Sequence, residues 1–348
     1  SLVCGWLGQT YSWAWGFGAA GIGMALGYLV FMWGKPLLEG HGEPPDPARL
    51  KRRVFAFLNA EWLIYFGGLA GVGVVWLLLR NNDAITITLP FVGDSVDMVG
   101  FLLMAASVLV LSYFVFFMAT QCTPVERHRL ILALVLIVSS VMFWALFEQA
   151  GTSLNQFAER NTDLSAGSVA VTAAQTQSFN SGFILIFAPV FSFIWAWLGR
   201  RNSDPNPVVK FGLAMLQLGA GFYILVWGAE FADANYRVPL VFLALAYLLH
   251  KTGELCLSPV GLSQMTKLAP ALLISTVMAT WFLASAWAQW FGAFIAQMTA
   301  AETVAGQVLD PAKALATYLE VFEMIGNAVI ILGLALLVLS PLLRRLAH

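Results

Sequence analysis

Charged residues are scarce in this chain. Only 11% of its 348 residues are Asp, Glu, Lys or Arg, whereas 59% are hydrophobic and the mean hydropathy is +0.79. Soluble domains carry about 25% charged residues, so this composition excludes a surface that faces water throughout, and the outer surface must face lipid. The formal net charge of −1 indicates neither an acidic nor a basic partner, and we expect no nucleic acid to bind.

Cysteine is scarce as well. Cys4, Cys122 and Cys256 lie far apart and form no Cys-x-x-Cys pair, which argues against a disulfide framework and against a zinc site. We predict that all three are buried as small apolar residues. No nucleotide-binding loop, metal cluster or nucleophile–base set stands out in the sequence, so we expect no enzyme, no metal and no cofactor.

Long apolar runs are what the sequence has instead. A helix needs about 20 mostly apolar residues to cross a hydrocarbon core about 30 Å thick, and no run alternates with the period of two that is typical of membrane β-strands. Since helices then remain as the way to satisfy backbone groups in lipid, we predict an all-α integral membrane protein. The expected spans are 14–34, 54–79, 98–120, 129–149, 180–199, 209–230, 238–258, 270–297 and 319–343.

The Lys and Arg residues predict how these spans are oriented. If the segment after the first span is cytoplasmic, thirteen of the 18 Lys and Arg residues fall on the cytoplasmic side, four fall on the other side, and Lys251 lies inside a span. This distribution follows the positive-inside tendency. We therefore expect a cytoplasmic C-terminus and Ser1 outside, with the Pro- and charge-rich stretch Glu39–Pro47 as a cytoplasmic linker.

Two local features of the spans predict packing and shape. Pro259, directly after the seventh expected span, removes a backbone donor and is expected to break the helix there, a feature typical of transporter binding sites. Small residues at close spacing let another helix approach tightly in lipid. Such a surface is predicted at Gly16, Gly18, Gly21, Gly23 and Gly27.

Ionisable residues inside the spans are the candidate functional groups, because each costs at least roughly 2.5–3.5 kcal/mol to insert. Glu148 closes the apolar run VMFWALF, and it either lines a pathway or lies hydrated near the membrane surface. Glu254 either binds a ligand or pairs with Lys251, three residues earlier, which would neutralise both. Glu61 is interpreted as an interfacial charge that reaches water. These residues predict a helical transporter or channel, but not its substrate.

Three segments carry longer motifs. Phe143–Asp163 reads FWALFEQAGTSLNQFAERNTD, Gly253–Pro270 reads GELCLSPVGLSQMTKLAP, and Gly5–Met24 reads GWLGQTYSWAWGFGAAGIGM. In that order they resemble the seventh-helix signature, the tenth-helix signature and the loop with the sixth helix of the proton-dependent oligopeptide transporters, a branch of the major facilitator superfamily. The resemblance covers essentially the whole chain, from the end of helix five to helix twelve.

This resemblance implies a partial major facilitator fold. Residues 1–38 would be the end of helix five and helix six of the N-terminal bundle, 39–53 a cytoplasmic linker, 54–122 an inserted hairpin of two helices, and 123–348 the C-terminal six-helix bundle. The family's helix-one ExxERFxYY motif and helix-four lysine would lie before Ser1, in the missing part of the N-terminal bundle. The chain would then hold about half of the expected site, in the cytoplasmic membrane of a bacterium.

The resemblance also implies roles for single residues. Glu148 matches a glutamate that takes part in proton coupling, and Glu254 matches one that contacts the amino terminus of the peptide. Asn180 matches an asparagine that also receives this amino group. Positions that line the family's pocket are matched by Trp144, Trp281, Ser285 and Ser258. An ammonium group requires a carboxylate and neutral oxygen acceptors, and variable side chains require apolar and aromatic walls.

The function that the resemblance implies is proton-coupled symport of di- and tripeptides by alternating access. The partners would be the peptide, protons, the lipid bilayer and the missing bundle. A carrier of another small solute in the same branch, such as nitrate or an amino-acid-like compound, and a non-transporting fragment are the alternatives. The combination of Glu254 and Asn180 favours a peptide.

Thiol labelling tests the orientation. We expect Arg200–Asn206 and the loop at Lys267 to be cytoplasmic, and Asn161–Gln177 to be outside, because of the distribution of Lys and Arg. In intact cells, a membrane-impermeant thiol reagent should label a Ser165→Cys variant and leave an Asn202→Cys variant unlabelled. Labelling of Asn202→Cys from outside would overturn the orientation.

Overall fold

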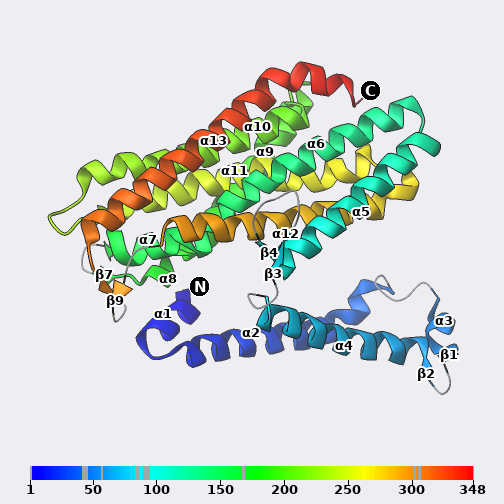
Figure 1. Ribbon diagram of the computed structural model, residues 1–348, viewed down its shortest axis with the longest axis horizontal. Helices are drawn as coiled ribbons and strands as arrows, with labels where there is room; N and C mark the ends of the chain where they lie inside the picture. The colour runs from blue at the N-terminus through cyan, green and yellow to red at the C-terminus, as the bar shows by residue number, and fades with distance from the viewer. Residues whose placement is uncertain are drawn as a thin grey trace. The chain divides into compact units, whose positions relative to one another are not determined.

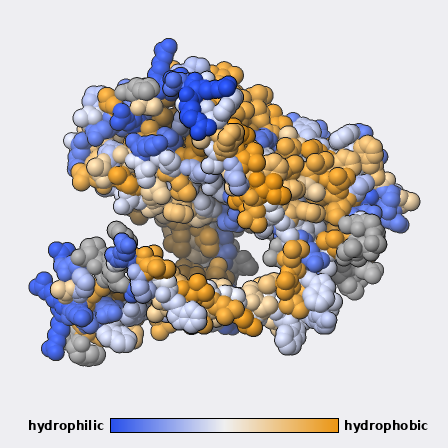
Figure 2. Space-filling view, turned by 180° about the vertical axis from the view of Figure 1, so that it is seen from behind, coloured by the Kyte–Doolittle hydropathy of each residue, from blue (hydrophilic) through white to orange (hydrophobic). Residues whose placement is uncertain are grey.

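The computed structural model describes residues 2–40, 46–55, 58–82, 86–88, 95–166, 169–300, 303–304 and 307–347. In these ranges, nine helical segments are long and apolar enough to cross a membrane. This agrees with the predicted all-α membrane protein. Figure 2 shows hydrophobic side chains spread over the outer faces of the helices, and residues such as Leu185 and Val338 are 77% exposed.

The elements follow one another along the chain as Figure 1 labels them. The first part comprises α1 (Leu2–Thr10), α2 (Trp13–Gly34), η1 (Lys35–Leu38), α3 (Pro47–Lys51), β1 (Arg53–Phe55), β2 (Leu58–Asn59), α4 (Ala60–Arg80), β3 (Thr86–Thr88), β4 (Ser95–Asp97) and α5 (Met98–Thr120). The middle part comprises α6 (Pro124–Phe147), η2 (Glu148–Gly151), α7 (Ser153–Asn161), β5 (Thr162–Asp163), β6 (Ser165–Ala166), β7 (Val169–Ala170), α8 (Ala173–Thr176) and α9 (Ser178–Arg200). The last part comprises α10 (Pro207–Gly228), η3 (Ala229–Phe231), β8 (Val238–Pro239), α11 (Leu240–Leu268), η4 (Ala271–Leu273), α12 (Ile274–Met298), β9 (Thr303–Val304), β10 (Gln307–Val308) and α13 (Pro311–Arg345).

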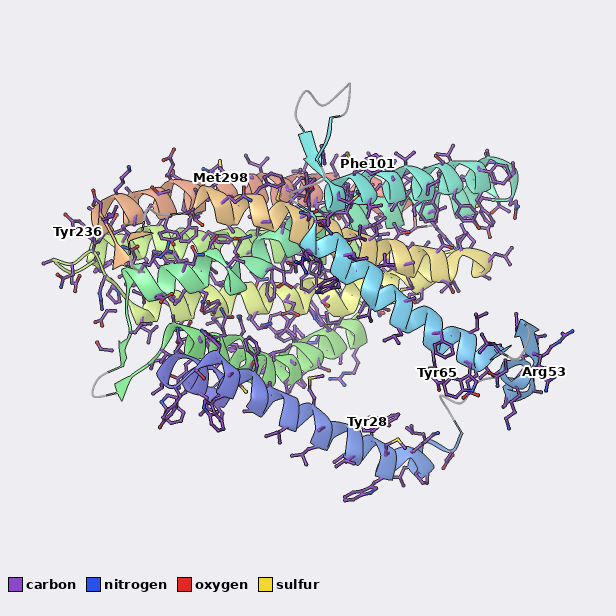
Figure 3. The ribbon with its side chains drawn as sticks, turned by 60° about the horizontal axis from the view of Figure 1, so that its bottom comes forward. Tyr28, Arg53, Tyr65, Phe101, Tyr236 and Met298 are labelled. Carbon is purple, nitrogen blue, oxygen red and sulfur yellow. The ribbon has the colours of Figure 1, made fainter. Side chains whose placement is uncertain are left out.

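The chain divides into two compact units. One contains the residues up to Gly16 together with those from Leu109 onwards, and the other contains Phe17–Val108. The second unit is built from α2, α4 and the first half of α5, and Figure 3 shows Arg53 in the β1–β2 ladder near the first turns of α4, where Tyr65 lies. The assignment of domains to parts of the major facilitator fold stays a prediction. The candidate functional residues all belong to the first unit.

Helix ends differ from the expected spans because polar caps extend or delay them. The second span was expected from residue 54, but residues 53–55 pair with β2 and α4 begins at Ala60, where the Asn59 side chain accepts a hydrogen bond from the Trp62 N–H at 2.9 Å. The last span was expected from residue 319, but Asp310 caps α13 eight residues earlier by accepting from the Lys313 N–H at 3.0 Å. Hydropathy alone therefore predicts the spans but not where their helices begin.

Pro259 does not break its helix. The structure continues α11 through this residue to Leu268, so the prediction of a broken helix is wrong. The missing proline donor removes one backbone hydrogen bond, and the rest of the ladder keeps the helix together. The broken-helix argument for a binding site in α11 falls away, and the site must be argued from side chains.

Close glycine contacts hold α10 against two neighbours. A Cβ atom added at Gly212 would lie 3.0 Å from the carbonyl oxygen of Gly333, and one at Gly219 would lie 3.0 Å from that of Gly326. On another side of α10, a Cβ at Gly221 would lie 2.5 Å from the His250 ring of α11. Small residues permit such an approach of two helix backbones in lipid. Figure 1 shows α10, α11 and α13 running alongside one another.

The predicted glycine surface is largely absent from α2. A Cβ at Gly16 would lie 2.7 Å from the carbonyl oxygen of Cys4, so Gly16 does pack closely. Among the described residues, Cβ positions at the other four glycines meet no atom within 4 Å: Gly18, Gly21, Gly23 and Gly27. The cysteine prediction holds for Cys122 and Cys256, which are buried, whereas Cys4 is half-buried.

Substitution at the α10–α13 contact should destabilise the first unit. A Cβ at Gly333 would lie 2.9 Å from the Met215 Cβ and 3.0 Å from the Gly212 carbonyl oxygen, atoms that can move only with their helix. We expect Gly333→Ala to lower the free energy of unfolding by about 1–3 kcal/mol. Gly199→Ala is the matched control, because its Cβ meets nothing within 4 Å. A thiol-reactive dye that reports exposure of Cys122 and Cys256 on heating measures both, and equal transition temperatures would contradict the packing argument.

Candidate functional site

Four polar side chains form a stripe along α11. Tyr247, Lys251, Glu254 and Ser258 follow one another at intervals of four, three and four residues, which places them on one side of the helix. The Lys251 Nζ lies 2.5 Å from the Glu254 Oε2, and the two side chains are 10% and 17% exposed. The sequence left a ligand role and an ion pair open for Glu254, and the structure shows the ion pair.

The Lys251 ammonium also connects α11 with the end of α6. Its Nζ lies 4.6 Å from the centroid of the Phe147 ring, within the range of a cation–π contact. Phe147 is the last residue of α6, and Glu148 follows it as the first residue of η2. The Lys251–Glu254 pair thus contacts the residue that directly precedes Glu148.

Glu148 lies where the α-helix tightens into a 3₁₀ turn. Its φ and ψ are −71° and −6°, and its backbone N–H donates to the carbonyls of Trp144 and Leu146. The side chain is exposed, and among the described residues it makes no ion pair or hydrogen bond.

Gln149 fixes this turn against α12. Its side chain is buried, and its Nε2 donates to the carbonyl oxygens of Ala145 at 2.9 Å and Gly292 at 3.1 Å. Its Oε1 accepts from the hydroxyls of Thr152 at 3.0 Å and Ser153 at 2.7 Å. Both ends of the amide are therefore satisfied, which is what a buried polar side chain requires.

Gln177 ties the same turn to α9. Its Nε2 donates to the carbonyl oxygen of Ala150, and its Oε1 accepts from the Asn180 Nδ2 at 3.4 Å. Segment 147–150, called here the η2 turn, is thus in contact with α9, α11 and α12 through the Ala150 carbonyl oxygen and the side chains of Phe147 and Gln149. These contacts link the segment that carries Glu148 to Asn180 by way of Gln177 and to Glu254 by way of Lys251.

Two of the predicted ligand residues have buried polar atoms without a partner. The Oδ1 of Asn180 and the Nε1 of Trp144 accept or donate no hydrogen bond within the described part of the chain. The Trp144 ring packs edge-on against Phe143 and Phe147, with centroid distances of 5.5 and 5.4 Å. A buried group without a partner costs about 1–3 kcal/mol, so a ligand that supplies the missing partners gains this free energy.

The other predicted residues lie between α11 and α12, away from the η2 turn. Trp281 is buried against α11, where a Cβ at Gly261 would lie 2.3 Å from its ring, and it contacts Phe211 at 6.4 Å. The Ser285 hydroxyl donates to the Trp281 carbonyl at 3.5 Å, and Ser258 is half-buried on α11. For the described residues, the structure records no hydrogen bond or ring contact that joins this group to the η2 turn.

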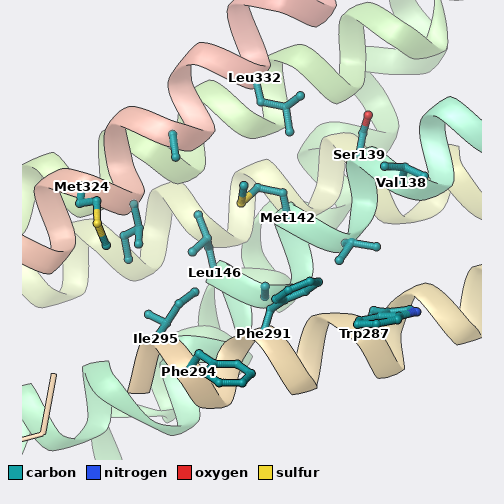
Figure 4. Close-up of a pocket in the computed structure, with 14 residues that line it drawn as sticks. Val138, Ser139, Met142, Leu146, Trp287, Phe291, Phe294, Ile295, Met324 and Leu332 are labelled. Atoms are coloured by element: carbon teal, nitrogen blue, oxygen red, sulfur yellow. The ribbon is translucent and has the colours of Figure 1, made fainter. Parts of the chain in front are cut away.

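An apolar groove opens elsewhere on the first unit, between α6, α12 and α13. It has a volume of about 730 Å³, and Figure 4 shows Met142, Phe291, Phe294 and Met324 around it. The Ser139 hydroxyl in its lining is occupied, because it donates to the Val135 carbonyl at 2.8 Å. The groove contains none of the predicted site residues and has no free polar group for a peptide, so the candidate site is the η2 turn.

The charge at Glu254 limits how many cations it holds. A second ammonium about 5 Å from the Lys251 Nζ would be repelled by roughly 3 kcal/mol at an effective dielectric constant of about 20. A second ammonium would also be attracted by the carboxylate, so this repulsion weakens its binding as long as the Lys251 ammonium stays in place. Lys251 therefore competes electrostatically with a second ammonium group at Glu254.

Comparison with known proteins identifies the family to which this chain belongs. A model of the POT family matches residues 1–314 of this chain. The chain belongs to the POT family. The partial major facilitator fold and the membership that the motifs predicted are thereby confirmed, as is a multi-pass membrane protein.

Members of the POT family with assigned names resemble the chain over most of its length. The peptide transporter YePEPT of Yersinia enterocolitica is 33% identical over 297 residues, which cover 82% of this chain and 55% of the relative. The uncharacterized transporter YclF of Bacillus subtilis is 33% identical over 348 residues, or 99% of this chain and 64% of the relative. The dipeptide and tripeptide permease A of Salmonella typhimurium is 30% identical over 351 residues and is covered to 64%. The chain spans less than two thirds of the length of these relatives.

Solved structures of the POT family are similar as well. A peptide transporter POT in complex with sulfate has a TM-score of 0.73 and 32% identity, with 99% of this chain and 65% of that chain covered. A mutant peptide transporter POT in complex with alafosfalin has a TM-score of 0.72 and 31% identity, with 99% and 64% covered. The relatives are transporters. The roles of single residues stay predictions, because none of these comparisons tests them.

Sequence reasoning missed Gln149, Gln177 and Tyr247. Tyr247 lies one turn before Lys251, so its spacing could have placed it on the polar stripe. Gln149 and Gln177 stand in or beside apolar runs, which marks them as buried polar residues that need partners. Their partners, at Gly292 and Ala150, come from distant segments and carry no local signal.

Removing the Gln149 amide should loosen the η2 turn. In Gln149→Leu the Gly292 carbonyl and the Thr152 and Ser153 hydroxyls lose partners, so we expect the free energy of unfolding to fall by about 2–4 kcal/mol, given about 1–3 kcal/mol for each buried group left unpaired. Gln121→Leu, at an exposed residue, is the control. Thermal unfolding of the two purified variants measures the difference, and a Gln149→Leu variant as stable as the control would rule the network out as a brace.

Proposed function

We propose that the protein carries short peptides across a membrane together with protons, by alternating access. One observation supports the proposal: Lys251, which is paired with Glu254 on α11, and Gln177, which is bonded to Asn180 on α9, both contact the η2 turn that carries the unpaired acid Glu148. The relatives that are named as transporters of peptides, dipeptides and tripeptides support it.

In this proposal, Glu254 and Asn180 bind the amino group of the peptide. An ammonium group has three donors, which a carboxylate and the partnerless Oδ1 of Asn180 can accept. The Trp144 Nε1, which also lacks a partner among the described residues, would donate to a peptide carbonyl. Walls for variable side chains would come from the aromatic and small polar groups of the second cluster, Trp281, Ser285 and Ser258.

Glu148 is the proton carrier in this proposal. It has no ionic partner in the described structure, so its charge can change without the loss of a buried ion pair. We place the protein in the cytoplasmic membrane of a bacterium with its C-terminus in the cytoplasm, as the distribution of Lys and Arg favours. The relatives are longer than this chain, which leaves room for a second helical bundle. In the proposal, this bundle would face the site and move so that the site opens to one side of the membrane at a time.

Substitution of Glu148 should separate proton coupling from peptide transport. We expect Glu148→Gln to abolish uphill accumulation of dipeptide in a proton gradient and to retain exchange of labelled for unlabelled dipeptide, because coupling requires a change of charge whereas exchange requires only reorientation of the loaded carrier. Glu159→Gln, at an exposed residue of α7, is the control and should retain both. Proteoliposomes that contain the complete transporter, with its second helical bundle, measure both activities, and undiminished uphill uptake by Glu148→Gln would remove Glu148 from the mechanism.

A further inference from the structure

Lys251 presents to Glu254 the same chemical group that a peptide would present. Its Nζ is a primary ammonium and lies 2.5 Å from the Glu254 Oε2. The amino terminus of a peptide is also a primary ammonium. The carboxylate that the proposed function assigns to the substrate is thus already occupied by a side chain of the same helix.

The Lys251 ammonium is held by few partners. An ammonium group can donate three hydrogen bonds, but the contacts recorded for this one are the bond to Glu254 and the face of the Phe147 ring. By comparison, Lys210 combines a hydrogen bond to Asp204 at 2.9 Å with a contact to the Trp195 ring at 4.3 Å, and Asp204 lies outside its helix. The Lys251 pair is intrahelical and leaves Lys251 free to swing without any movement of the backbone.

Neither charged side chain is completely enclosed. The side chains of Lys251 and Glu254 are 10% and 17% exposed, so each keeps a small part of its surface uncovered. Within the described structure, the Glu254 Oε1 has no recorded partner. A permanent structural pair in lipid would be expected to have its remaining donors and acceptors satisfied.

We infer that Lys251 is an internal competitor of the substrate: its ammonium occupies the Glu254 carboxylate in the empty protein, and the amino group of the substrate displaces it. This rests on the proposed function. Since the Lys251 ammonium would repel a second ammonium at the same carboxylate, a ligand binds Glu254 more favourably when it replaces Lys251. Lys251 is then a specificity-determining residue, because a ligand whose amino group is blocked cannot replace it.

Removing the competitor should strengthen binding of free amino groups only. We expect Lys251→Met to bind dialanine about tenfold more tightly than the native protein, and N-acetyldialanine with unchanged affinity, as measured by titration of the purified protein at neutral pH, where the amino group of dialanine is an ammonium. Lys251→Arg, which keeps a cation with more donors, should bind dialanine more weakly. Lys267→Met, at an exposed lysine of the same helix, is the matched control and should change neither affinity.

The opposite results would overturn the inference. If Lys251→Met bound dialanine as weakly as Glu254→Gln does, Lys251 would assist the carboxylate and would not compete for it. An equal gain for dialanine and N-acetyldialanine would show a general effect on the pocket and would likewise contradict it.

A second measurement does not depend on peptide transport. A water-soluble carbodiimide should join Lys251 to Glu254 as an amide with loss of one water, and added glycinamide should be captured on Glu254 in place of this link. Mass spectrometry of the digested protein identifies both products. If native protein binds no dipeptide yet glycinamide replaces the internal link, the proposed function fails and the competition stands. If glycinamide is never captured on Glu254, even in Lys251→Met, the competition fails.

Discussion

The close packing of α10 against α11 determines what the rest of the site can be. His250 lies against Gly221, and a Cβ at Gly253 would lie 3.0 Å from the Ala214 carbonyl, so this side of α11 is occupied by helix backbone. Lys251 and Glu254 each follow one of these contacts by a single residue, which rotates them about 100° around the helix. They are therefore turned toward the η2 turn, where the Phe147 ring meets the lysine. A bulkier residue at Gly221 would disturb this alignment before it touched any ligand.

Some buried polar side chains of this protein have all their hydrogen-bond partners, and others lack one. The side chains that lack a partner are the candidates for binding a ligand. Gln149 makes four hydrogen bonds through its amide, so it is a brace with nothing left for a ligand. Asn180 and Trp144 each keep a buried polar atom that has no partner among the described residues. Such atoms destabilise the empty protein, and binding of a complementary ligand removes that cost. Gln149 thus stabilises the turn, whereas the unsatisfied atoms of Asn180 and Trp144 are the groups from which the proposed ligand would gain free energy.

How much of this was visible in the sequence depends on the range of each interaction. Apolar runs of about 20 residues are local, so the nine spans could be predicted, whereas α4 began later than expected because Asn59 caps it after a short ladder. The Lys251–Glu254 pair was foreseen as an alternative because its partners are three residues apart. The glycine contacts of α10 were not foreseen, and neither was the bond from Gln149 to Gly292, because both join residues far apart in the chain. The expectation that a proline breaks its helix was wrong at Pro259, because hydrogen bonds in the neighbouring turns keep α11 intact.

The ion pair on α11 also bears on how substrate and proton are connected. A lone carboxylate in lipid costs more free energy than a paired one. Lys251 therefore lowers the free-energy cost of the Glu254 charge while no ligand is present. Under the proposed displacement, a substrate ammonium would take the lysine's place and keep the charge around Glu254 balanced, and the displaced lysine would become the unpaired group. The Phe147 ring that it contacts is followed directly by Glu148, the unpaired acid of the η2 turn. Phe147 thus joins the ion pair to the segment that carries Glu148, so under the proposed function a ligand at Glu254 would change the contacts of that segment.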